Sequence, residues 1–111
     1  MDATASLHPA VQRYFVSVKD RDASALTKAF TENAEVLDVS RHIKGRANIK
    51  KWASNEVIGG IYEILNIESP NEKSQHVLLH FTPLGAASGF KALYSFELLD
   101  GKIVFANLQY A

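Results

Sequence analysis

Asp38 is the residue whose type and position most clearly suggest chemistry. The stretch 34–42, AEVLDVSRH, alternates like a β-strand, so successive side chains should face opposite sides of a sheet. One side carries the charged Glu35 and Arg41, which indicate contact with water. Asp38 lies on the other side, with the small or apolar Ala34, Val36 and Ser40. A carboxylate facing an apolar space is poorly solvated, so Asp38 is expected either to hydrogen-bond a nearby backbone amide or side chain, or to act on a ligand as an acid or base.

Two tyrosines are expected to point toward the same space. Tyr14 belongs to an apolar stripe of helical period, with Val11, Phe15 and Val18, that should face the core. Tyr94 lies in the predicted strand FKALYSFEL, on the face it shares with Phe90, Ala92 and Phe96. A buried phenol usually needs a hydrogen-bond partner. The pattern therefore predicts that one carboxylate and two hydroxyls converge in an apolar pocket.

The composition argues against several other functions. The chain has no cysteine, which excludes a thiolate metal site and a cysteine nucleophile. His76 and His80 would stand about 13 Å apart on a strand, whereas two ligands of one zinc ion each lie within about 2.1 Å of it. Twelve basic and twelve acidic residues cancel, so the basic excess typical of nucleic-acid binding is missing. We expect neither a metal nor a cofactor, because proton transfer needs none and no such motif is visible.

Length and hydropathy place the chain among small soluble proteins. Its 111 residues predict a single domain spanning 1–111. No window of about 18 apolar residues predicts a membrane span. The N-terminus lacks a basic start followed by an apolar run, so it does not resemble a signal peptide. We expect a cytoplasmic protein that contacts neither membrane nor nucleic acid.

Three helices and a run of strands must position these residues. Pro9 suits the first turn of a helix, and Asp22 suits the N-cap of a second. The second helix would have an apolar stripe of Leu26, Ala29 and Phe30 and would end at TENA. After the strand around Asp38, a third helix would carry Trp52 on its buried side.

The second half of the chain has the pattern of an antiparallel sheet. IYEILNIE, HVLLHFT, FKALYSFEL and KIVFANLQY are rich in β-branched and aromatic residues, and Asp100-Gly101 is a strong hairpin signal. Helices that precede such a sheet would cover one of its faces, which is an α+β fold. A curved sheet around helices would leave a conical cavity.

This order of elements resembles the NTF2-like superfamily. The stretch 11–52 looks like its SnoaL-like branch, with an aromatic pair on the first helix, an RD start to the second, an F-x-x-[DN]-A exit, a strand with an internal Asp, and G-x-x-x-I before an aromatic residue. The first half is also similar to bacterial ketosteroid isomerase. The resemblance implies a cone of three N-terminal helices packed in a strongly curved mixed or antiparallel sheet.

The resemblance also implies roles for the three polar residues. In ketosteroid isomerase a strand Asp shuttles a proton next to a carbonyl, and Asp38 stands in that place. Tyr14 matches the tyrosine that donates to the enolate oxygen, and Tyr94 replaces the second donor, a protonated acid. An isomerase or polyketide cyclase acting on a small, mostly apolar carbonyl compound would follow. The expected ligand contacts are Leu26, Phe30, Trp52, Phe90, Phe96, Ala106 and Leu108.

Other interpretations stay open. The chain could be a non-catalytic module that binds a small molecule or dimerises, with Asp38 bonded to a neighbour. A hydratase or epoxide hydrolase is less favoured, because it needs a second acid or base and the inward positions offer no obvious one; Glu63 is a candidate whose face is ambiguous. The basic run is expected to be a solvated face or an anion site at the pocket rim: Arg41, Lys44, Arg46, Lys50 and Lys51.

An isologous homodimer would cover the outer sheet face through Leu78, Phe105, Leu93 and Val39.

Overall fold

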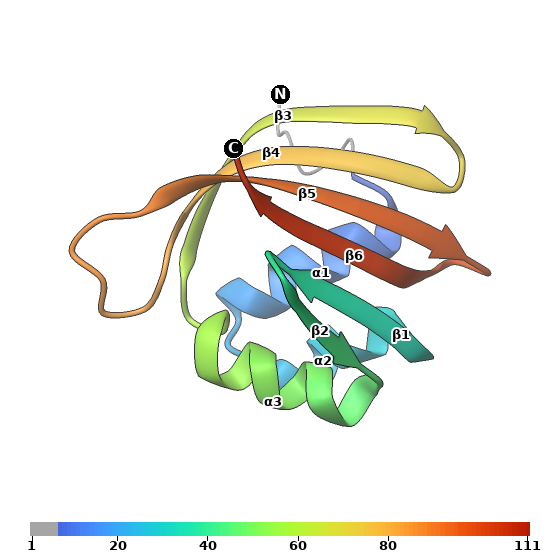
Figure 1. The fold of residues 1–111 in the computed structure, drawn as a ribbon, viewed down its shortest axis with the longest axis horizontal. Helices are drawn as coiled ribbons and strands as arrows, with labels where there is room; N and C mark the ends of the chain where they lie inside the picture. Colours follow the sequence, from blue (N-terminus) through green and yellow to red (C-terminus); the bar gives the residue numbers. More distant parts are fainter. Residues whose placement is uncertain (1–6) are drawn as a thin grey trace.

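The computed structural model describes residues 7–111, which form three helices and one six-stranded sheet (Figure 1). In chain order these are α1 (Pro9–Lys19), α2 (Ala23–Lys28), β1 (Phe30–Asp38), β2 (Arg41–Lys44), α3 (Arg46–Glu56), β3 (Ile61–Asn71), β4 (Ser74–Thr82), β5 (Phe90–Leu99) and β6 (Lys102–Tyr110). The strand order is β2-β1-β6-β5-β4-β3. β1 and β6 run parallel and the other neighbouring pairs antiparallel. The expected α+β class is confirmed, but α3 follows β1 and β2, so the three helices do not all precede the strands.

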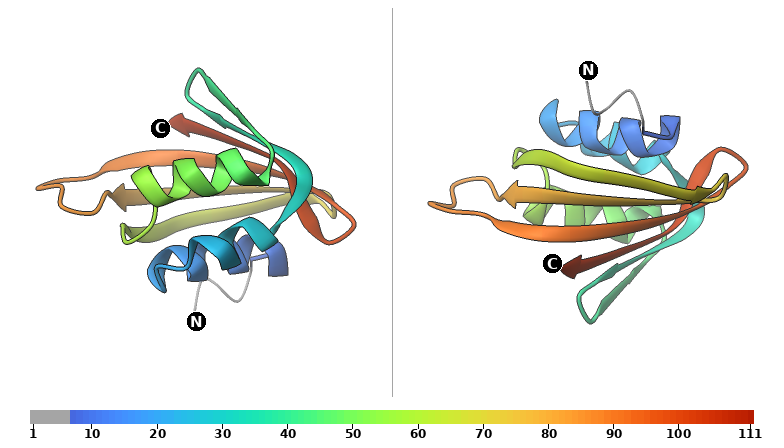
Figure 2. Two further views of the ribbon diagram at one scale, coloured as in Figure 1. Left: turned by 90° about the horizontal axis from the view of Figure 1, so that it is seen from below. Right: turned by 90° about the horizontal axis from the view of Figure 1, so that it is seen from above.

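The sheet curves around the helices, with α1 and α3 on the same side of it (Figure 2). Alternation along the strands decides which side chains meet the helices. The buried members are Gln75, Val77, Leu79 and Phe81 on β4 and Ala92, Tyr94, Phe96 and Leu98 on β5. Rings from α1 pack against this inner face, with Phe15 5.8 Å from Tyr94 and Tyr14 5.8 Å from Phe96 between centroids. This aromatic cluster fills the closed end of the cone.

Local capping explains where the first two helices begin. Pro9 lies in the first turn of α1, and the His8 ring accepts a hydrogen bond from the Ala10 N–H at 3.1 Å. Asp22 caps α2 as predicted, because its Oδ1 accepts from the Ala25 N–H at 2.9 Å. However, α2 ends at Lys28, and Phe30 and the TENA segment belong to β1. No helix within residues 7–111 is long and apolar enough to cross a membrane.

The stretch 34–42 is a hairpin rather than the single strand that alternation predicts. β1 ends at Asp38, a two-residue turn follows, and Asp38 pairs with Arg41 across the turn. The first turn residue, Val39, has a φ of +60°, a conformation that usually requires Gly in such turns. Contacts from β6 hold it, since the Val39 N–H donates to the Leu108 carbonyl at 2.9 Å and Gln109 donates to the Val39 carbonyl at 3.0 Å. The turn brings Arg41 next to Asp38.

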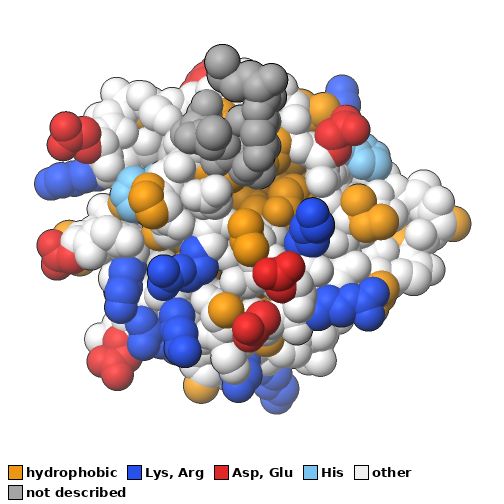
Figure 3. All heavy atoms as spheres, turned by 180° about the vertical axis from the view of Figure 1, so that it is seen from behind, with side chains coloured by type: hydrophobic (Ala, Val, Ile, Leu, Met, Phe, Trp, Pro, Cys, Tyr) orange, Lys and Arg blue, Asp and Glu red, His pale blue; other side chains and the backbone are white. Residues whose placement is uncertain are grey.

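The basic run does not behave as one surface. Lys44, Lys50 and Lys51 are exposed, as expected. Arg46 is half-buried and donates to the Phe30 carbonyl through Nε at 3.1 Å and Nη2 at 2.7 Å, which ties α3 to β1. On the face shown in Figure 3, basic side chains gather toward one edge and acidic ones lie among them.

The outer face of the sheet carries a few partly exposed apolar residues. Leu78, Leu93 and Phe105 lie there, as expected. Val39 does not belong to this face, because it occupies the β1–β2 turn. A homodimer through the outer face stays a prediction.

Candidate functional site

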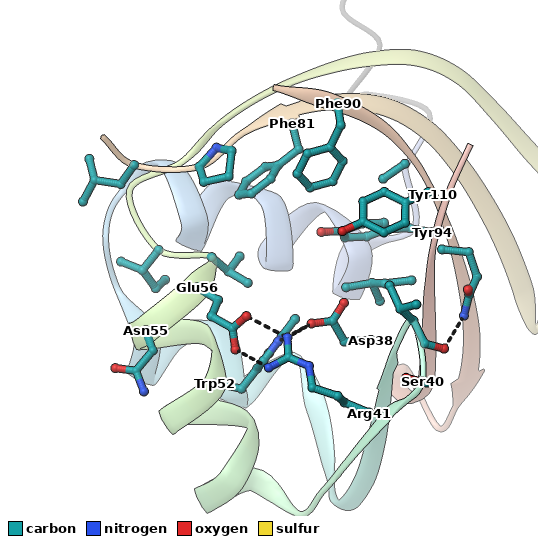
Figure 4. A pocket seen from close by; sticks show the side chains of 18 of the residues that line it. Asp38, Ser40, Arg41, Trp52, Asn55, Glu56, Phe81, Phe90, Tyr94 and Tyr110 are labelled. Atoms are coloured by element: carbon teal, nitrogen blue, oxygen red, sulfur yellow. Dashed lines mark hydrogen bonds and ion pairs between the residues drawn. The ribbon is translucent and has the colours of Figure 1, made fainter. Parts of the chain in front are cut away.

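A cavity of about 690 Å³ opens between the β1–β2 turn, the end of α3 and the ends of β4, β5 and β6 (Figure 4). This volume is typical of small-molecule sites. The lining from the turn and α3 is largely polar and includes Asp38, Ser40, Arg41, Ser54, Asn55 and Glu56. The lining from the sheet and the loop after β4 is mostly apolar and includes Phe81, Pro83, Leu84, Phe90, Ala92, Tyr94, Leu108 and Tyr110. The cavity therefore suits a ligand with one polar and one apolar side.

Asp38 reaches the cavity as alternation predicts, but its surroundings are not purely apolar. Its Oδ2 accepts a hydrogen bond from the Trp52 Nε1–H at 3.1 Å and forms an ion pair with Arg41. No residue within 7–111 donates a hydrogen bond to Oδ1, and the carboxylate faces the cavity (Figure 4). One oxygen is thus held in place while the other can meet a ligand. The sequence predicts an apolar environment for Asp38, whereas the structure places an ion pair and an indole N–H beside it.

Arg41 links Asp38 to a second carboxylate that the sequence did not indicate. Its Nη1 and Nη2 donate to the two oxygens of Glu56 at 2.9 and 2.7 Å, in the bidentate geometry that suits a guanidinium. Hydrogen bonds to Glu56 and Asp38 raise the pKa of Arg41 above its usual value. Arg41 belongs to the basic run, which is expected to be a solvated face or an anion site at the pocket rim, and its side chain is 55% exposed at the edge of the cavity while it pairs with these two carboxylates. Only a predicted hairpin turn at Val39–Ser40 could have indicated that Arg41 lies next to Asp38.

The two tyrosines lie one behind the other. Tyr94 lines the cavity, whereas Tyr14 lies beneath it in the core, with 6.0 Å between the ring centroids. The Tyr14 hydroxyl is fully buried and forms no hydrogen bond of ordinary geometry within residues 7–111, yet Tyr94 is close enough to influence its pKa. Burial raises the pKa of Tyr14 well above 10.0, and Tyr94 and Asp38 add to the effect. The structure brings Asp38 and Tyr94 to one cavity and leaves Tyr14 outside it.

Tyr94 remains a hydrogen-bond donor over the whole physiological range. Burial raises its pKa to about 12, and the Asp38 charge adds to this, while an interaction with Tyr14 opposes it. A protonated phenol can donate to an oxygen that gains negative charge, which is the property an oxyanion site needs.

The raised pKa of Tyr94 predicts that the folded protein loses stability at alkaline pH. The pKa of Tyr94 is about 12 in the folded protein and 10.0 in the reference state, so the unfolded chain loses its proton first. Its stabilisation is complete below about pH 10 and disappears as the pH rises to about 12, a change of roughly 3 kcal/mol. Urea unfolding across this range should show the loss, and Tyr94→Phe should reduce it. Tyr110→Phe, which removes an exposed hydroxyl, is the control, and an unchanged loss in Tyr94→Phe would contradict the assignment.

The predicted ligand contacts divide into two groups. Trp52, Phe90 and Leu108 line the cavity. The other four do not line it and are buried in the core: Leu26, Phe30, Phe96 and Ala106. Tyr14 and Phe15 of α1 occupy the closed end of the cone. Their rings fill the space in which a ligand was expected to contact the four core residues. Alternation in the sequence predicts which side of the sheet a residue faces. It does not predict how far the helices fill the space on that side.

A glycine allows one wall of the cavity to form. A Cβ atom on Gly60 would lie 2.5 Å from the Phe81 ring, closer than real contacts permit. Only glycine therefore lets Phe81 rest against the start of β3 and complete the apolar wall.

Comparison with known proteins identifies the fold. No protein-family model matches the sequence, and no curated protein is similar to it in sequence. A proposed polyketide cyclase from Sinorhizobium meliloti superposes with a TM-score of 0.84 at 22% identity, covering 97% of this chain and 100% of that chain. A proposed ketosteroid isomerase from Kribbella flavida gives 0.81 at 14%, covering 94% and 76%. The chain has the NTF2-like fold.

A third NTF2-like structure adds another chemistry. SalBIII, an epoxide hydrolase/cyclase-like enzyme in pyran ring formation of the polyether salinomycin, gives a TM-score of 0.79 at 24% identity, covering 92% of this chain and 88% of that chain. At such identities the similarity establishes the fold, which confirms the predicted NTF2-like resemblance. It does not establish an activity, because one fold hosts many functions.

Proposed function

We propose that the protein transfers a proton at a carbon next to a carbonyl group, with Asp38 as the general base and Tyr94 as the oxyanion donor. One observation carries this proposal. Within residues 7–111 no group donates to the Asp38 Oδ1, which faces the cavity that Tyr94 lines, while Trp52 and Arg41 hold Oδ2. A positioned base beside a protonated phenol is the pair of groups that enolisation requires.

Each group has a defined part in the step. Asp38 Oδ1 takes the proton from the α-carbon, the C–H electron pair forms the C=C bond, and negative charge develops on the carbonyl oxygen. The Tyr94 hydroxyl donates a hydrogen bond to that oxygen, which stabilises the transition state more than the ground state. Asp38 then returns the proton to another carbon, as in an isomerase. In a cyclase the enolate carbon instead attacks a second carbonyl carbon of the same molecule, the C=O π pair moves to that oxygen, and the resulting alkoxide takes the proton from Asp38. Tyr14 is proposed as a positioning residue behind Tyr94.

The substrate is proposed to be a small, mostly apolar carbonyl compound. The apolar sheet wall would hold its hydrocarbon part, and Asp38 and Tyr94 would meet its reactive end. The proposed cyclase and isomerase assignments of two proteins with this fold support the same class of chemistry.

Deuterium exchange of cyclohexanone in heavy water, followed by NMR, tests the proposal without knowledge of the natural substrate. The protein should exchange the α-protons faster than buffer and with saturation. Tyr94→Phe should lower the catalysed rate about 10²- to 10³-fold, because an oxyanion donor is lost. Saturable binding without exchange would favour a non-catalytic binding module, and a full rate in Tyr94→Phe would remove Tyr94 from the mechanism.

Epoxide opening by water is the second candidate, because Glu56 supplies the second carboxylate that this chemistry needs. Asp38 and Glu56 are joined by one guanidinium at the polar wall of the cavity. The epoxide hydrolase/cyclase-like description of SalBIII is compatible with it. Hydrolysis of cyclohexene oxide without exchange of cyclohexanone would favour this candidate over proton transfer at carbon.

A further inference from the structure

Three aromatic rings form a row from the interior of the cavity to its rim. They lie on three neighbouring strands, with Phe81 on β4, Phe90 on β5 and Tyr110 on β6. Ring centroids are 6.0 Å apart for Phe81 and Phe90 and 5.2 Å apart for Phe90 and Tyr110. Their exposure rises along the row, from 6% to 38% to 68%. Figure 4 shows the three rings side by side on the wall that faces Asp38.

This row continues the candidate active site outward along β5. Phe90, Ala92 and Tyr94 alternate onto the same face of the strand, and Tyr110 pairs with Ala92. Ala92 is small, so no bulky side chain separates the Tyr94 hydroxyl from the row. Tyr94 and Phe90 are four residues apart, about 13 Å along a strand. A molecule held at Tyr94 must therefore extend about that far to cover Phe90.

Neighbouring rings of the row meet edge to face, and an exposed aromatic pair such as Phe90 and Tyr110 is unusual on a monomer surface unless something covers it. The apolar row is continuous with the cavity, which indicates that the ligand itself is the cover. The lining residues also disfavour an anionic ligand, because the described part of the lining has two carboxylates, Asp38 and Glu56, against one cation, Arg41.

We infer that Phe81, Phe90 and Tyr110 form a subsite for the distal apolar part of an elongated substrate that carries no negative charge and is about two rings long. This inference rests on the proposed function for the placement of the carbonyl at Tyr94. It adds a substrate length and a second contact region, both outside the reacting groups.

Two ketones that differ by one ring test the subsite. The probes are cyclohexanone and its derivative with a phenyl group on the carbon opposite the carbonyl. Binding is followed by the fluorescence of Trp52, the single tryptophan, which lines the cavity. The phenyl derivative should bind on the order of tenfold more tightly to the unaltered protein, because a ring becomes buried.

Variants decide whether the row is responsible for that gain. Phe90→Ala and Tyr110→Ala should abolish most of the ratio between the two dissociation constants, whereas Tyr110→Phe should keep it. Leu93→Ala is the matched control, since Leu93 is 39% exposed on the same strand but on the opposite face. It should change neither the ratio nor the exchange of cyclohexanone. Melting temperatures show that each variant is folded.

Each outcome separates the subsite from the proposed function. No gain in the unaltered protein, or a gain that persists in both alanine variants, overturns the subsite. A change from dimer to monomer in Tyr110→Ala, measured by light scattering, also overturns it, because a second copy would then cover the row. A gain that depends on the row, without proton exchange of either ketone, supports the subsite and removes the proposed function.

Discussion

Asp38→Asn is expected to slow the exchange of cyclohexanone α-protons about 10²- to 10⁴-fold, since the variant lacks the base. The amide keeps an oxygen that can accept from Trp52 and Arg41, so the geometry around the side chain should persist. What is lost is the ability of Oδ1 to take up a proton. NMR measurement of the exchange rate at saturating ketone isolates this step from ligand binding.

Asp100→Asn is the matched control for this substitution. Asp100 is exposed in the turn between β5 and β6 and does not line the cavity. Its replacement removes one negative charge and should leave the exchange rate unchanged. If Asp38→Asn keeps the full rate while the ketone still binds, Asp38 is not the base, and the cavity is better described as a binding site.

Phe96→Ala is expected to destabilise the protein by about 3–5 kcal/mol, because it leaves a cavity in the middle of the core. Phe96 is 1% exposed, and its ring centroid is 5.8 Å from those of Tyr14 and Tyr94 and 6.0 Å from that of Phe15. A domain of this size has a total stability of about 5–15 kcal/mol, so this loss is a large fraction of it. The free energy of unfolding in urea measures the change.

Leu93→Ala is again the control, because it truncates an apolar residue of the same strand on the outer face. Its cost should lie below about 1 kcal/mol, as for exposed positions in general. A similarly small cost for Phe96→Ala would show that its ring is not part of a packed core. Phe96 would then be available to a ligand, as the sequence first suggested.

Features that depend on local periodicity could be predicted from the sequence. Alternation placed Asp38 and Tyr94 on inner faces, and the stripe around Tyr14 placed its ring in the core. The N-cap at Asp22 also followed from residue type alone. These features require only the geometry of a strand or helix and a few neighbouring residues.

Features that depend on distant contacts could not be predicted. Val39 adopts a positive φ that its own type disfavours, and the contacts that hold it come from Leu108 and Gln109 on β6. Without that turn, the pairing of Arg41 with Asp38 and Glu56 cannot be foreseen. The boundary between core and cavity also depends on how far α1 enters the cone, which periodicity does not encode.

The central claim is that one cavity presents the Oδ1 of Asp38 and the hydroxyl of Tyr94 to the same carbonyl ligand. A crystal structure of the protein with phenol, which resembles an enolate, tests this claim most directly. We expect the phenol oxygen within hydrogen-bond distance of the Tyr94 hydroxyl and its ring carbons next to Asp38 Oδ1. Phenol bound elsewhere, or a cavity closed by the protein's own side chains, would contradict it.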